Sequence, residues 1–476
     1  MRSRLWPVPV VVFLVIWGLT THGKFSLTGD EPHYLVMAES LRADGDLDLG
    51  NNYAPAASPF APDAVAAEQH ARLDRRGRLR SVHDPGVALL LLPVYAVAVQ
   101  VAGTVPAATL ASVRMTPGLF IYAIVSLAQL ALACLAMALL AAALVPAVPI
   151  AQARAAVWIA ALTPPLLANS FLVFPEVPAL FVTCTVVWAC GAGRARAWSL
   201  PVTAAAIGLL PWLHRKFALF ALGLLFVLLW DRREEIRAVP RRAAVAGALF
   251  AAPVVAFFAL SWQWWGHLGG PTAIDGVPLW IGAFAMGAPG LLIDRENGLL
   301  VWGPIHLAGL VAWWQTRTRT WPFAVPALLL AVPCAAHNLW WGGFAPAARF
   351  LVPLIPFLAV ALAPRLAERR VVRALVVLGI PQIVICAIGW QRPRFLWPRG
   401  DGQNRVLEAI PGVGPTLDAA LPSFRTGPLD PMAVAVTIAV VAGAAVALHY
   451  AMRPAAATSP ASRAGISSAR THPPIV

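Results

Sequence analysis

Two adjacent carboxylates, Asp30 and Glu31, lie within the sequence GDEPHY at residues 29–34. They follow an apolar segment at residues 5–20 and open the longest polar stretch of the chain, residues 22–84. Charged groups beside a bilayer are costly and are usually kept for a function. A carboxylate in that place can take a proton from a hydroxyl group, which is general base chemistry. Asp30 and Glu31 are therefore the first catalytic candidates.

The composition is that of a membrane protein. Of 476 residues, 59% are hydrophobic and only 12% are charged, whereas a soluble domain usually carries about 25% charged residues. The net charge of +14 comes mainly from short basic runs between apolar segments, as expected when positive loops face the cytoplasm. This pattern argues against a nucleic-acid-binding protein and predicts an all-α polytopic membrane protein.

The apolar segments have the length needed to cross a bilayer, and we expect about 12 or 13 transmembrane helices. Beyond the segment at 5–20, they lie at residues 86–102, 117–144, 151–168, 171–191, 197–213, 217–230, 243–265, 298–315, 321–340, 350–364, 372–390 and 431–451. Arg2 and Arg4 place the N-terminus in the cytoplasm, so the loop that starts at residue 22 lies outside. The charge pattern leaves two alternatives for 86–102, which either crosses the membrane or returns to the side where it began.

We expect one membrane domain, residues 1–453, with a first extracytoplasmic loop at 22–85 and a disordered cytoplasmic tail at 454–476. Within the loop, residues 30–43 predict a short helix that Asp30 caps and that lies on the bilayer surface. The following residues, as far as 80, read as irregular structure. The five cysteines all lie in apolar segments, so no disulfide framework is predicted.

The predicted topology places several other charged residues on the same outer face as Asp30. Glu176 follows a Phe-Pro pair, residues 214–216 read His-Arg-Lys between two spans, and Arg349 precedes another span. The acidic stretch at 294–296 and the loop at 391–405 are also assigned to this face. Basic residues outside contradict the positive-inside tendency and need a reason, and the phosphate of an anionic lipid would supply one.

Four short motifs resemble those of the GT-C glycosyltransferases, which include the aminoarabinose transferases of lipid A and the protein O-mannosyltransferases. GDEPHY at 29–34 looks like the acidic motif of that group, and HDPG at 83–86 is similar to its proline element at the end of the first loop. FPE at 174–176 and ARFLVP at 348–353 resemble a second outer carboxylate and an Arg-aromatic segment. The chain departs from the group in lacking a double proline and a large outer domain after the last span.

The resemblance implies a transfer reaction in the cell envelope. Its donor would be a sugar carried by a polyprenyl phosphate, and its acceptor an extracytoplasmic hydroxyl group on a glycan, lipid or protein. The sugar would move with inversion, with Asp30 as general base and Glu31 orienting the acceptor or binding a metal. Cationic side chains would stabilise the departing lipid phosphate. The residues expected to bind substrate are Tyr34, His83, Glu176, His214, Arg215, Lys216 and Arg349.

Each of these residues also has a structural interpretation. Asp30 and Glu31 could serve only the start of a helix, and His33 and His83 could be interfacial polar residues. Arg215 and Lys216 could extend towards lipid headgroups. No metal ligand is assigned, although His and Glu side chains on the outer face are residue types that could hold a divalent metal as cofactor.

Two other functions compete with a transferase. A lipid-linked sugar flippase or transporter would also need cations for the phosphate, but it would not need a carboxylate pair at the membrane surface and would often show internal repeats, which we do not see. A structural scaffold would leave the outer charges without a role. The transferase is therefore the preferred hypothesis.

Overall fold

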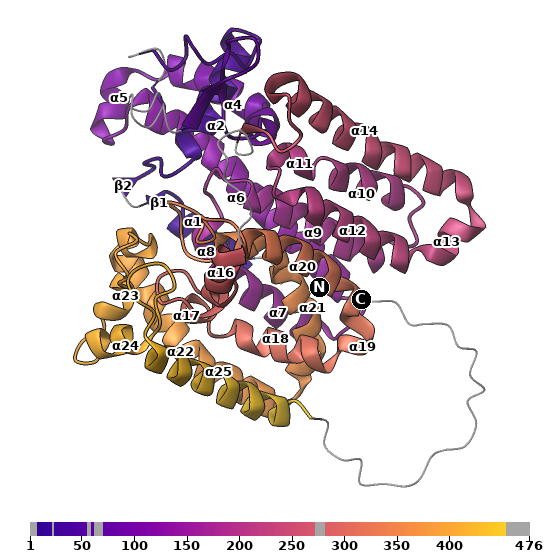
Figure 1. Ribbon diagram of the computed structural model, residues 1–476, viewed down its shortest axis with the longest axis vertical. Helices are drawn as coiled ribbons and strands as arrows, with labels where there is room; N and C mark the ends of the chain where they lie inside the picture. The colour runs from indigo at the N-terminus through magenta and orange to yellow at the C-terminus, as the bar shows by residue number, and fades with distance from the viewer. Residues whose placement is uncertain (1–6, 21–22, 55–58, 61–69, 272–280, 454–476) are drawn as a thin grey trace.

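The structure is a computed structural model that describes residues 7–20, 23–54, 59–60, 70–271 and 281–453. Its regular structure is almost entirely helical (Figure 1). The described strands form two short antiparallel hairpins, β1 (Leu19–Thr20) with β2 (Gly23–Lys24), and β3 (Ala71–Leu73) with β4 (Leu79–Ser81). The expected all-α fold class is confirmed. The tail predicted at 454–476 lies outside the described residues.

The helices follow one another along the whole chain. Those of the first half are α1 (Pro7–Ile16), α2 (Glu31–Ala43), α4 (Gly86–Thr104), α5 (Ala107–Ser112), α6 (Pro117–Leu144), α7 (Ile150–Leu162), α8 (Leu166–Asn169), α9 (Glu176–Cys190), α10 (Ser199–Gly208), α11 (Leu210–Leu213), α12 (Phe217–Asp231) and α13 (Arg233–Ala238). Those of the second half are α14 (Pro240–Trp265), α16 (Ile281–Ile293), α17 (Leu299–Trp302), α18 (His306–Gln315), α19 (Arg317–Thr320), η2 (Trp321–Phe323), α20 (Ala324–Ala335), η3 (Arg349–Leu354), α21 (Ile355–Leu362), η4 (Ala363–Ala367), α22 (Arg369–Gln391), η5 (Pro393–Leu396), α23 (Arg405–Glu408), α24 (Gly414–Ala420) and α25 (Pro431–Ala451).

Among the described residues, six helical segments are long and apolar enough to cross a membrane. They are Gly86–Thr104, Pro117–Leu144, Pro240–Trp265, Arg349–Ala367, Arg369–Gln391 and Pro431–Ala451. Six shorter apolar helices of 10–17 residues accompany them. The protein is thus a multi-pass helical membrane protein, while the expected number of 12 or 13 spans stays a prediction.

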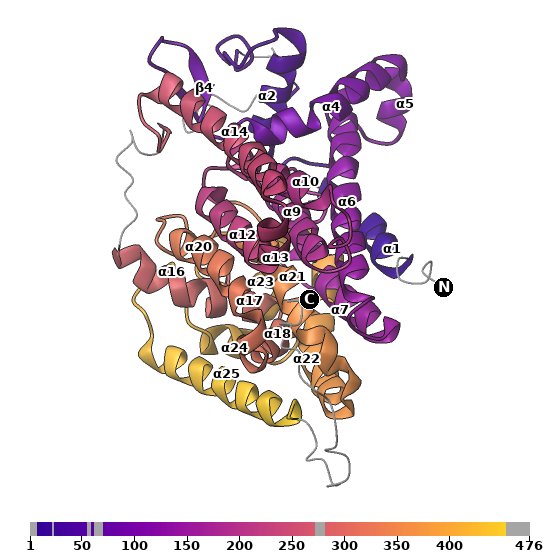
Figure 2. The ribbon, with the colours of Figure 1, turned by 90° about the vertical axis from the view of Figure 1, so that its right-hand side faces the viewer.

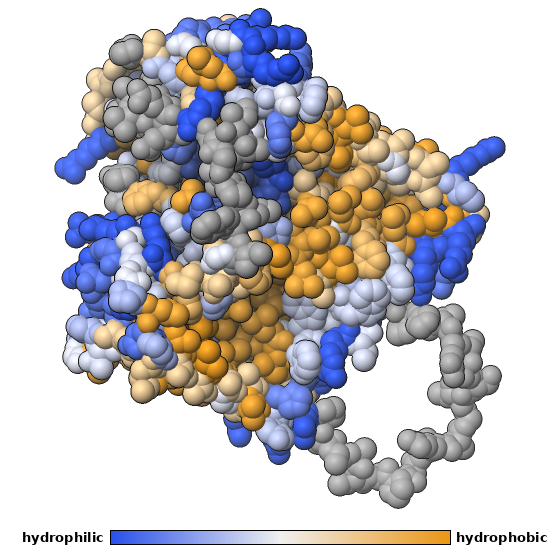
Figure 3. Space-filling model, in the orientation of Figure 1, coloured by the Kyte–Doolittle hydropathy of each residue, from blue (hydrophilic) through white to orange (hydrophobic). Residues whose placement is uncertain are grey.

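The surface shows where a bilayer would lie. In Figure 3, apolar residues form a broad region between hydrophilic residues at the left, over α23 and α24, and hydrophilic residues at the right, over α13. The sequence assigned the basic run around α13 to the inside and residues 391–405 to the outside, and the side that each of them faces stays a prediction. Figure 2 shows α2, β4, α4 and α5 together at one end of the molecule.

The segment at 86–102 forms helix α4 (Gly86–Thr104), which packs against the first loop. Helix α4 begins directly after the first loop, and Phe60 of that loop contacts Tyr95 in its middle, with ring centroids 6.2 Å apart. The next long helix, α6, also begins at the loop, because a Cβ at Gly118 would lie only 2.9 Å from Pro59. Helices α4 and α6 thus both contact the first loop, and whether α4 crosses the membrane stays open.

Helix α2 confirms the predicted helix but corrects its setting. It packs against α4, and its buried residues point in several directions around the helix axis, with His33, Leu35 and Ser40 buried as well as Tyr34 and Met37. It is therefore enclosed by protein and does not lie on the bilayer surface with one face in lipid. The expected amphipathic surface helix was wrong because the first loop folds over α2.

The stretch after α2 was expected to be irregular as far as residue 80, but its end forms the β3–β4 hairpin. Asp74 stabilises the turn, since its Oδ1 accepts hydrogen bonds from the backbone N–H groups of Arg76 and Arg78 at 2.8 and 3.0 Å. Its Oδ2 pairs with Arg80 at 3.0 Å. The hairpin brings the two ends of this segment, residues 70 and 82, to hydrogen-bonding distance.

Helix α9 supplies the centre of the bundle. It is buried along almost its whole length and packs against α6, α10, α12 and the 3₁₀ helix η3. Its first residue, Glu176, contacts Lys216 and Arg349, and Arg349 in turn contacts Asp30 of the first loop. The ends of α2, α9, α12 and η3 therefore meet beneath that loop, and most of the predicted site residues lie at these ends.

Candidate active site

Asp30 occupies the N-cap position of α2, but its side chain does not cap the helix. Its backbone is already helical, with φ −80° and ψ −7°, and its carboxylate turns instead to Arg349, whose Nη2 donates a hydrogen bond of 3.0 Å to Oδ2. The predicted capping role of Asp30 is thus wrong. Gly29 makes this geometry feasible, because it has φ +54° and a Cβ there would lie 2.4 Å from the carbonyl oxygen of Phe344.

The protonation state of Asp30 is set by two opposing effects. Burial alone would raise its pKa, but the charge of Arg349, with smaller contributions from His83 and His70, lowers the pKa well below its ordinary value. The side chain keeps 21% of its surface exposed. Asp30 is therefore ionised at any physiological pH and reachable by a small polar group.

Arg349 connects Asp30 to a second carboxylate. Its guanidinium lies 4.5 Å from the centre of the Phe174 ring and its Nε is 3.8 Å from Oε1 of Glu176. Arg349 is the first residue of η3, and Ala348 before it has a positive φ of 55°, which aims the arginine inward. Only 9% of its side chain is exposed, so its charge is held within the protein by the two acids.

Glu176 and Lys216 form the next link. Lys216 Nζ donates to Glu176 Oε1 at 2.5 Å, and the Glu176 side chain has no exposed surface. Lys216 also lies 4.2 Å from the centre of the Phe350 ring. Burial lowers the pKa of Lys216, although Glu176 opposes this shift. Asp30, Arg349, Glu176 and Lys216 thus form a continuous chain of alternating charges, which we call the charge chain.

Arg215 is held by Asp84, at the end of the first loop. The Asp84 carboxylate accepts from the Arg215 guanidinium at 2.5 Å and from its backbone N–H at 2.7 Å. Gly86 lets these segments approach, because a Cβ there would lie 2.3 Å from the backbone of Trp212. The first loop and the turn at 214–216 therefore lie on the same side of the molecule, as predicted. That this side is extracytoplasmic stays a prediction.

Several buried polar atoms around the charge chain have no hydrogen-bond partner among the described residues. They are the Tyr34 hydroxyl, Oε2 of Glu176, Nε of Arg349 and Nη1 of Arg215. The Tyr34 side chain is 1% exposed, and nearby Asp30 and Glu176 add to burial in raising the pKa of its hydroxyl. An unpartnered buried polar atom costs about 1–3 kcal/mol, so the atoms of Tyr34, Glu176 and Arg349 along the charge chain indicate a site built for a polar ligand.

Glu31 differs from its neighbour Asp30. Its Oε1 accepts from the Tyr122 hydroxyl and from the backbone N–H of Val173, both at 2.7 Å, and its Oε2 accepts from Thr28 N–H at 2.9 Å. Burial raises its pKa to about 7, against these hydrogen bonds. Glu31 therefore fastens α2 to α6 and to the segment before α9.

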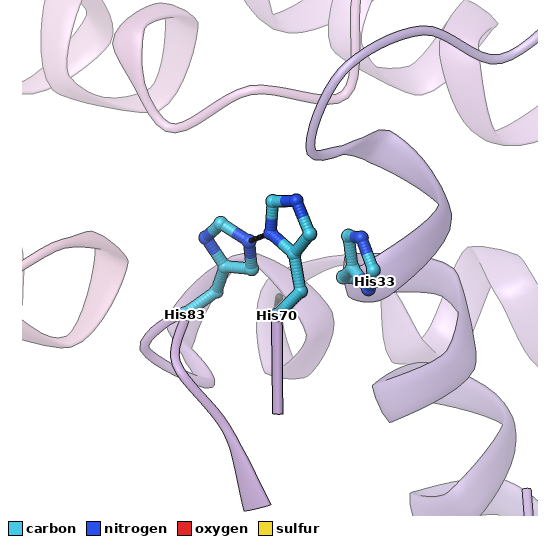
Figure 4. A group of neighbouring side chains, drawn as sticks. All are labelled: His33, His70 and His83. Carbon is cyan, nitrogen blue, oxygen red and sulfur yellow. Dashed lines mark hydrogen bonds between the residues drawn. The ribbon is translucent and has the colours of Figure 1, made fainter. Parts of the chain in front are cut away.

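Three histidines, His33, His70 and His83, lie together beside Asp30. The sequence analysis named His33 and His83 but did not predict that they meet. Nδ1 of His70 lies 2.9 Å from Nε2 of His83, and the rings of His33 and His70 stack with centroids 4.0 Å apart (Figure 4). His33 Nδ1 is 2.7 Å from the Tyr53 hydroxyl. Burial lowers the pKa of His33 to about 2 and that of His83 to about 4.

The remaining predicted residues have clear places. The His214 ring accepts from the backbone N–H of Lys216 at 3.2 Å, so it shapes the turn that holds the lysine. The acidic residues at 294–296 contact other segments, with Asp294 accepting from Phe424 N–H and Glu296 from Gly400 N–H. They stabilise the loops after α22 and have no contact with the charge chain in the described structure.

Sequence reasoning missed His70, Tyr122 and the pairing of Asp84 with Arg215. A signal existed for His70, because the turn sequence Asp-Arg-Arg-Gly at 74–77 predicts a hairpin that would bring residues 70 and 83 together. No local signal points to Tyr122, which meets Glu31 from 91 residues away.

Comparison with known proteins gives one structural likeness. No protein-family model matches the chain, and no curated protein matches it. Among solved structures, it is similar to the crystal structure of ArnT from Cupriavidus metallidurans bound to undecaprenyl phosphate. The two are 14% identical, the match covers 94% of this chain and 74% of that one, and the TM-score is 0.45. The function must therefore be argued from the site itself.

Proposed function

We propose that this protein is a membrane glycosyltransferase that moves a sugar from a polyprenyl-phosphate donor to an extracytoplasmic hydroxyl group, with inversion and with Asp30 as general base. The observation that carries the proposal is the charge chain with its unpartnered polar atoms. It brings the accessible ionised carboxylate of Asp30, in the first loop, together with the buried cations Arg349 and Lys216. Those are the groups that a transfer from a lipid phosphate needs.

The reaction assigns a task to Asp30, Arg349 and Lys216. The acceptor oxygen forms a bond to the anomeric carbon while Asp30 takes its proton. The bond from that carbon to the phosphate oxygen breaks, and the electron pair leaves with the lipid phosphate. Arg349 and Lys216 would stabilise this phosphate, because charge-assisted hydrogen bonds to an anion are among the strongest that side chains make.

Arg349 also connects donor binding to the strength of the base. A carboxylate with a strongly lowered pKa takes up a proton poorly. The low pKa of Asp30 depends on Arg349, whose Nη2 lies only 3.0 Å from Asp30 Oδ2. A donor phosphate that draws Arg349 towards itself would raise the pKa of Asp30, so the base would become effective once the donor is bound.

Glu31 takes a supporting part in this proposal. The sequence prediction paired it with Asp30 as a catalytic residue, but three hydrogen bonds already occupy its two oxygens. Its bond to Val173 lies one residue from Phe174, whose ring contacts Arg349. We therefore assign Glu31 to positioning α2 against the segment that supports Arg349.

An apolar cavity nearby supports a lipid donor. It has a volume of about 450 Å³ and lies between α1, the α7–α8 region and α22. Phe171 lines it, two residues before Val173, which binds Glu31. We propose that this cavity takes part of the isoprenoid chain while the phosphate reaches the charge chain.

The test replaces Asp30 by Asn, which keeps the shape but cannot take up the proton. We expect Asp30→Asn to fold, to bind a polyprenyl-phosphate sugar, and to transfer labelled sugar to a cell-envelope acceptor fraction at least about 100-fold more slowly. The matched control is Asp44→Asn at the exposed C-terminal end of the same helix, which should transfer normally.

The outcome separates a transferase from a flippase. Full transfer activity in Asp30→Asn would remove the base and with it the main reason to prefer an enzyme. If the wild-type protein moves the lipid-linked sugar between leaflets and transfers none of it, the flippase is the correct function. Donor binding measured on the same preparations shows whether the variant lost chemistry or binding.

A further inference from the structure

The three-histidine cluster beside Asp30 has the composition and spacing of a metal site. One nitrogen from each of His33, His70 and His83 lies within 4.8 Å of the other two (Figure 4). In a tetrahedral zinc site with Zn–N bonds of about 2.0–2.1 Å, two ligand nitrogens lie about 3.3 Å apart. The distance of 2.9 Å between His70 and His83 is close to that value. The His33 ring stacks on that of His70, so His33 would have to turn for its nitrogen to join the other two on one ion.

The fold holds the three rings from separate segments. His33 lies in the first turn of α2, His70 directly before β3, and His83 two residues after β4. The hairpin fixes the last two, because Val82 N–H donates to the carbonyl of His70 at 2.9 Å. His33 uses Nδ1 for the Tyr53 hydroxyl, which leaves its Nε2 for a ligand. Such an outer hydrogen bond is the usual way in which proteins orient a metal-binding imidazole.

We propose that His33, His70 and His83 bind one Zn²⁺ ion, or a similar divalent transition metal, with one coordination position left open. Imidazole nitrogens are the preferred ligands of zinc, copper and nickel among neutral side chains. Three protein ligands with a free fourth position are typical of zinc sites that take part in a reaction, whereas closed sites with four protein ligands are structural.

The charge balance of the region supports a bound cation. Asp30, Glu176 and Asp84 carry three negative charges, and Arg349, Lys216 and Arg215 carry three positive ones, all within the ion pairs described above. A phosphate group that binds Arg349 and Lys216 would leave these six residues and the ligand with a net negative charge. A divalent ion at the histidines would supply the missing positive charge next to Asp30.

The role of the ion rests on the proposed transferase function, whereas the metal site itself does not. A hydroxyl group bound at the open position would become more acidic, because a divalent metal lowers the pKa of an oxygen ligand. Asp30 lies beside His70 and His83 and would take the proton from that hydroxyl group. The ion would thus act together with the donor phosphate, which draws Arg349 away from Asp30.

The experiment measures metal binding directly on the purified full-length protein. The protein is stripped with a chelator and titrated with Zn²⁺, and bound metal is counted by mass spectrometry. A second titration with Co²⁺ reports the ligands by visible absorption. We expect one ion per chain, with affinity at least about 100-fold lower in His70→Ala and about 10-fold lower in Tyr53→Phe, which removes only the outer hydrogen bond.

His267→Ala is the matched control, because His267 is exposed in the loop after α14 and its ring accepts from Gly269 N–H. It should bind metal like the wild type. Zinc should also raise the unfolding temperature of the wild type and of His267→Ala but not that of His70→Ala. Because each protein is compared with and without zinc, this change in unfolding temperature still reports metal binding if His70→Ala is less stable than the wild type.

Two results would overturn the site: a wild-type protein that binds no stoichiometric Zn²⁺ or Co²⁺, or equal affinity in His70→Ala. The proposed function fails separately, if metal binds but no sugar is transferred. If metal binds and its removal leaves transfer unchanged, the site stands and its part in the reaction is refuted.

Discussion

Two groups of buried carboxylates lie in the loops of this protein, and they are satisfied in different ways. Asp30 and Glu176 are paired with the side chains of Arg349 and Lys216. Asp294, in contrast, accepts hydrogen bonds from three backbone N–H groups and an amide, at 2.7–3.1 Å. In sequence Asp30 and Asp294 look alike, since each follows an apolar segment and has a second acid within two residues.

The difference indicates which group can bind something else. Backbone N–H groups cannot move to a ligand without unfolding the loop, so Asp294 has a structural role. Arginine and lysine side chains can exchange a carboxylate for a phosphate, and Glu176 Oε2 and Arg349 Nε already lack a hydrogen-bond partner among the described residues. Glu31 resembles Asp294 in this respect, although it is the direct neighbour of Asp30.

The largest stability effect should come from breaking the charge chain. Lys216→Ala leaves the fully buried Glu176 without its nearest cation, and Arg349 at 3.8 Å compensates only in part. Removing one partner of a buried ion pair costs about 3–5 kcal/mol. We expect a loss of that size in the free energy of unfolding in detergent.

The paired replacement Lys216→Met with Glu176→Gln removes both charges and should recover most of the stability, though not the donor affinity. A loss below about 1 kcal/mol in Lys216→Ala would mean that the pair is solvated, and the contrast with Asp294 would disappear.

The buried Glu31 should make the free energy of unfolding depend on pH, by about 3 kcal/mol. Its pKa is 4.5 in the unfolded chain and about 7 when folded. Between these values the unfolded chain has released the proton that the folded protein still holds, so stability falls as pH rises from about 4.5 to about 7 and is constant above. A shift of 2.5 pKa units at about 1.36 kcal/mol per unit gives the magnitude.

The measurement compares the pH dependence of unfolding of Glu31→Gln with that of the wild type. The variant should lack this fall in stability, and its transfer activity should drop less than that of Asp30→Asn. Parallel pH profiles for the two proteins would show that Glu31 is ionised throughout the range, contrary to its buried setting.

Asp294→Asn should give the smallest effect and should leave the chemistry intact. An amide group in place of Oδ2 would face the N–H of Phe424, which would then lack an acceptor. One unsatisfied buried group costs about 1–3 kcal/mol. We expect that loss in unfolding free energy, with sugar transfer per folded molecule unchanged. Transfer that falls as far as in Asp30→Asn would place Asp294 in the reaction.

Local sequence patterns were sufficient to predict the helices and to single out the candidate carboxylates. The helix at 31–43, the membrane helices and the shared side of residues 84 and 215 all follow from hydropathy and charge along the chain. The patterns could not decide whether α4 crosses the membrane, because its composition satisfies either topology. They also misplaced α2 on the bilayer surface, since its enclosure depends on the loop that folds over it.

The sequence by itself determined that this is a helical membrane protein with acidic and basic residues gathered on one face. Only the tertiary structure decided which of them meet. Arg349 reaches Asp30 across 319 residues, and Tyr122 reaches Glu31 across 91. Adjacent carboxylates received different partners because successive residues of a helix point in different directions. Asp30 therefore faces the cation of η3, while Glu31 faces α6 and the backbone before α9.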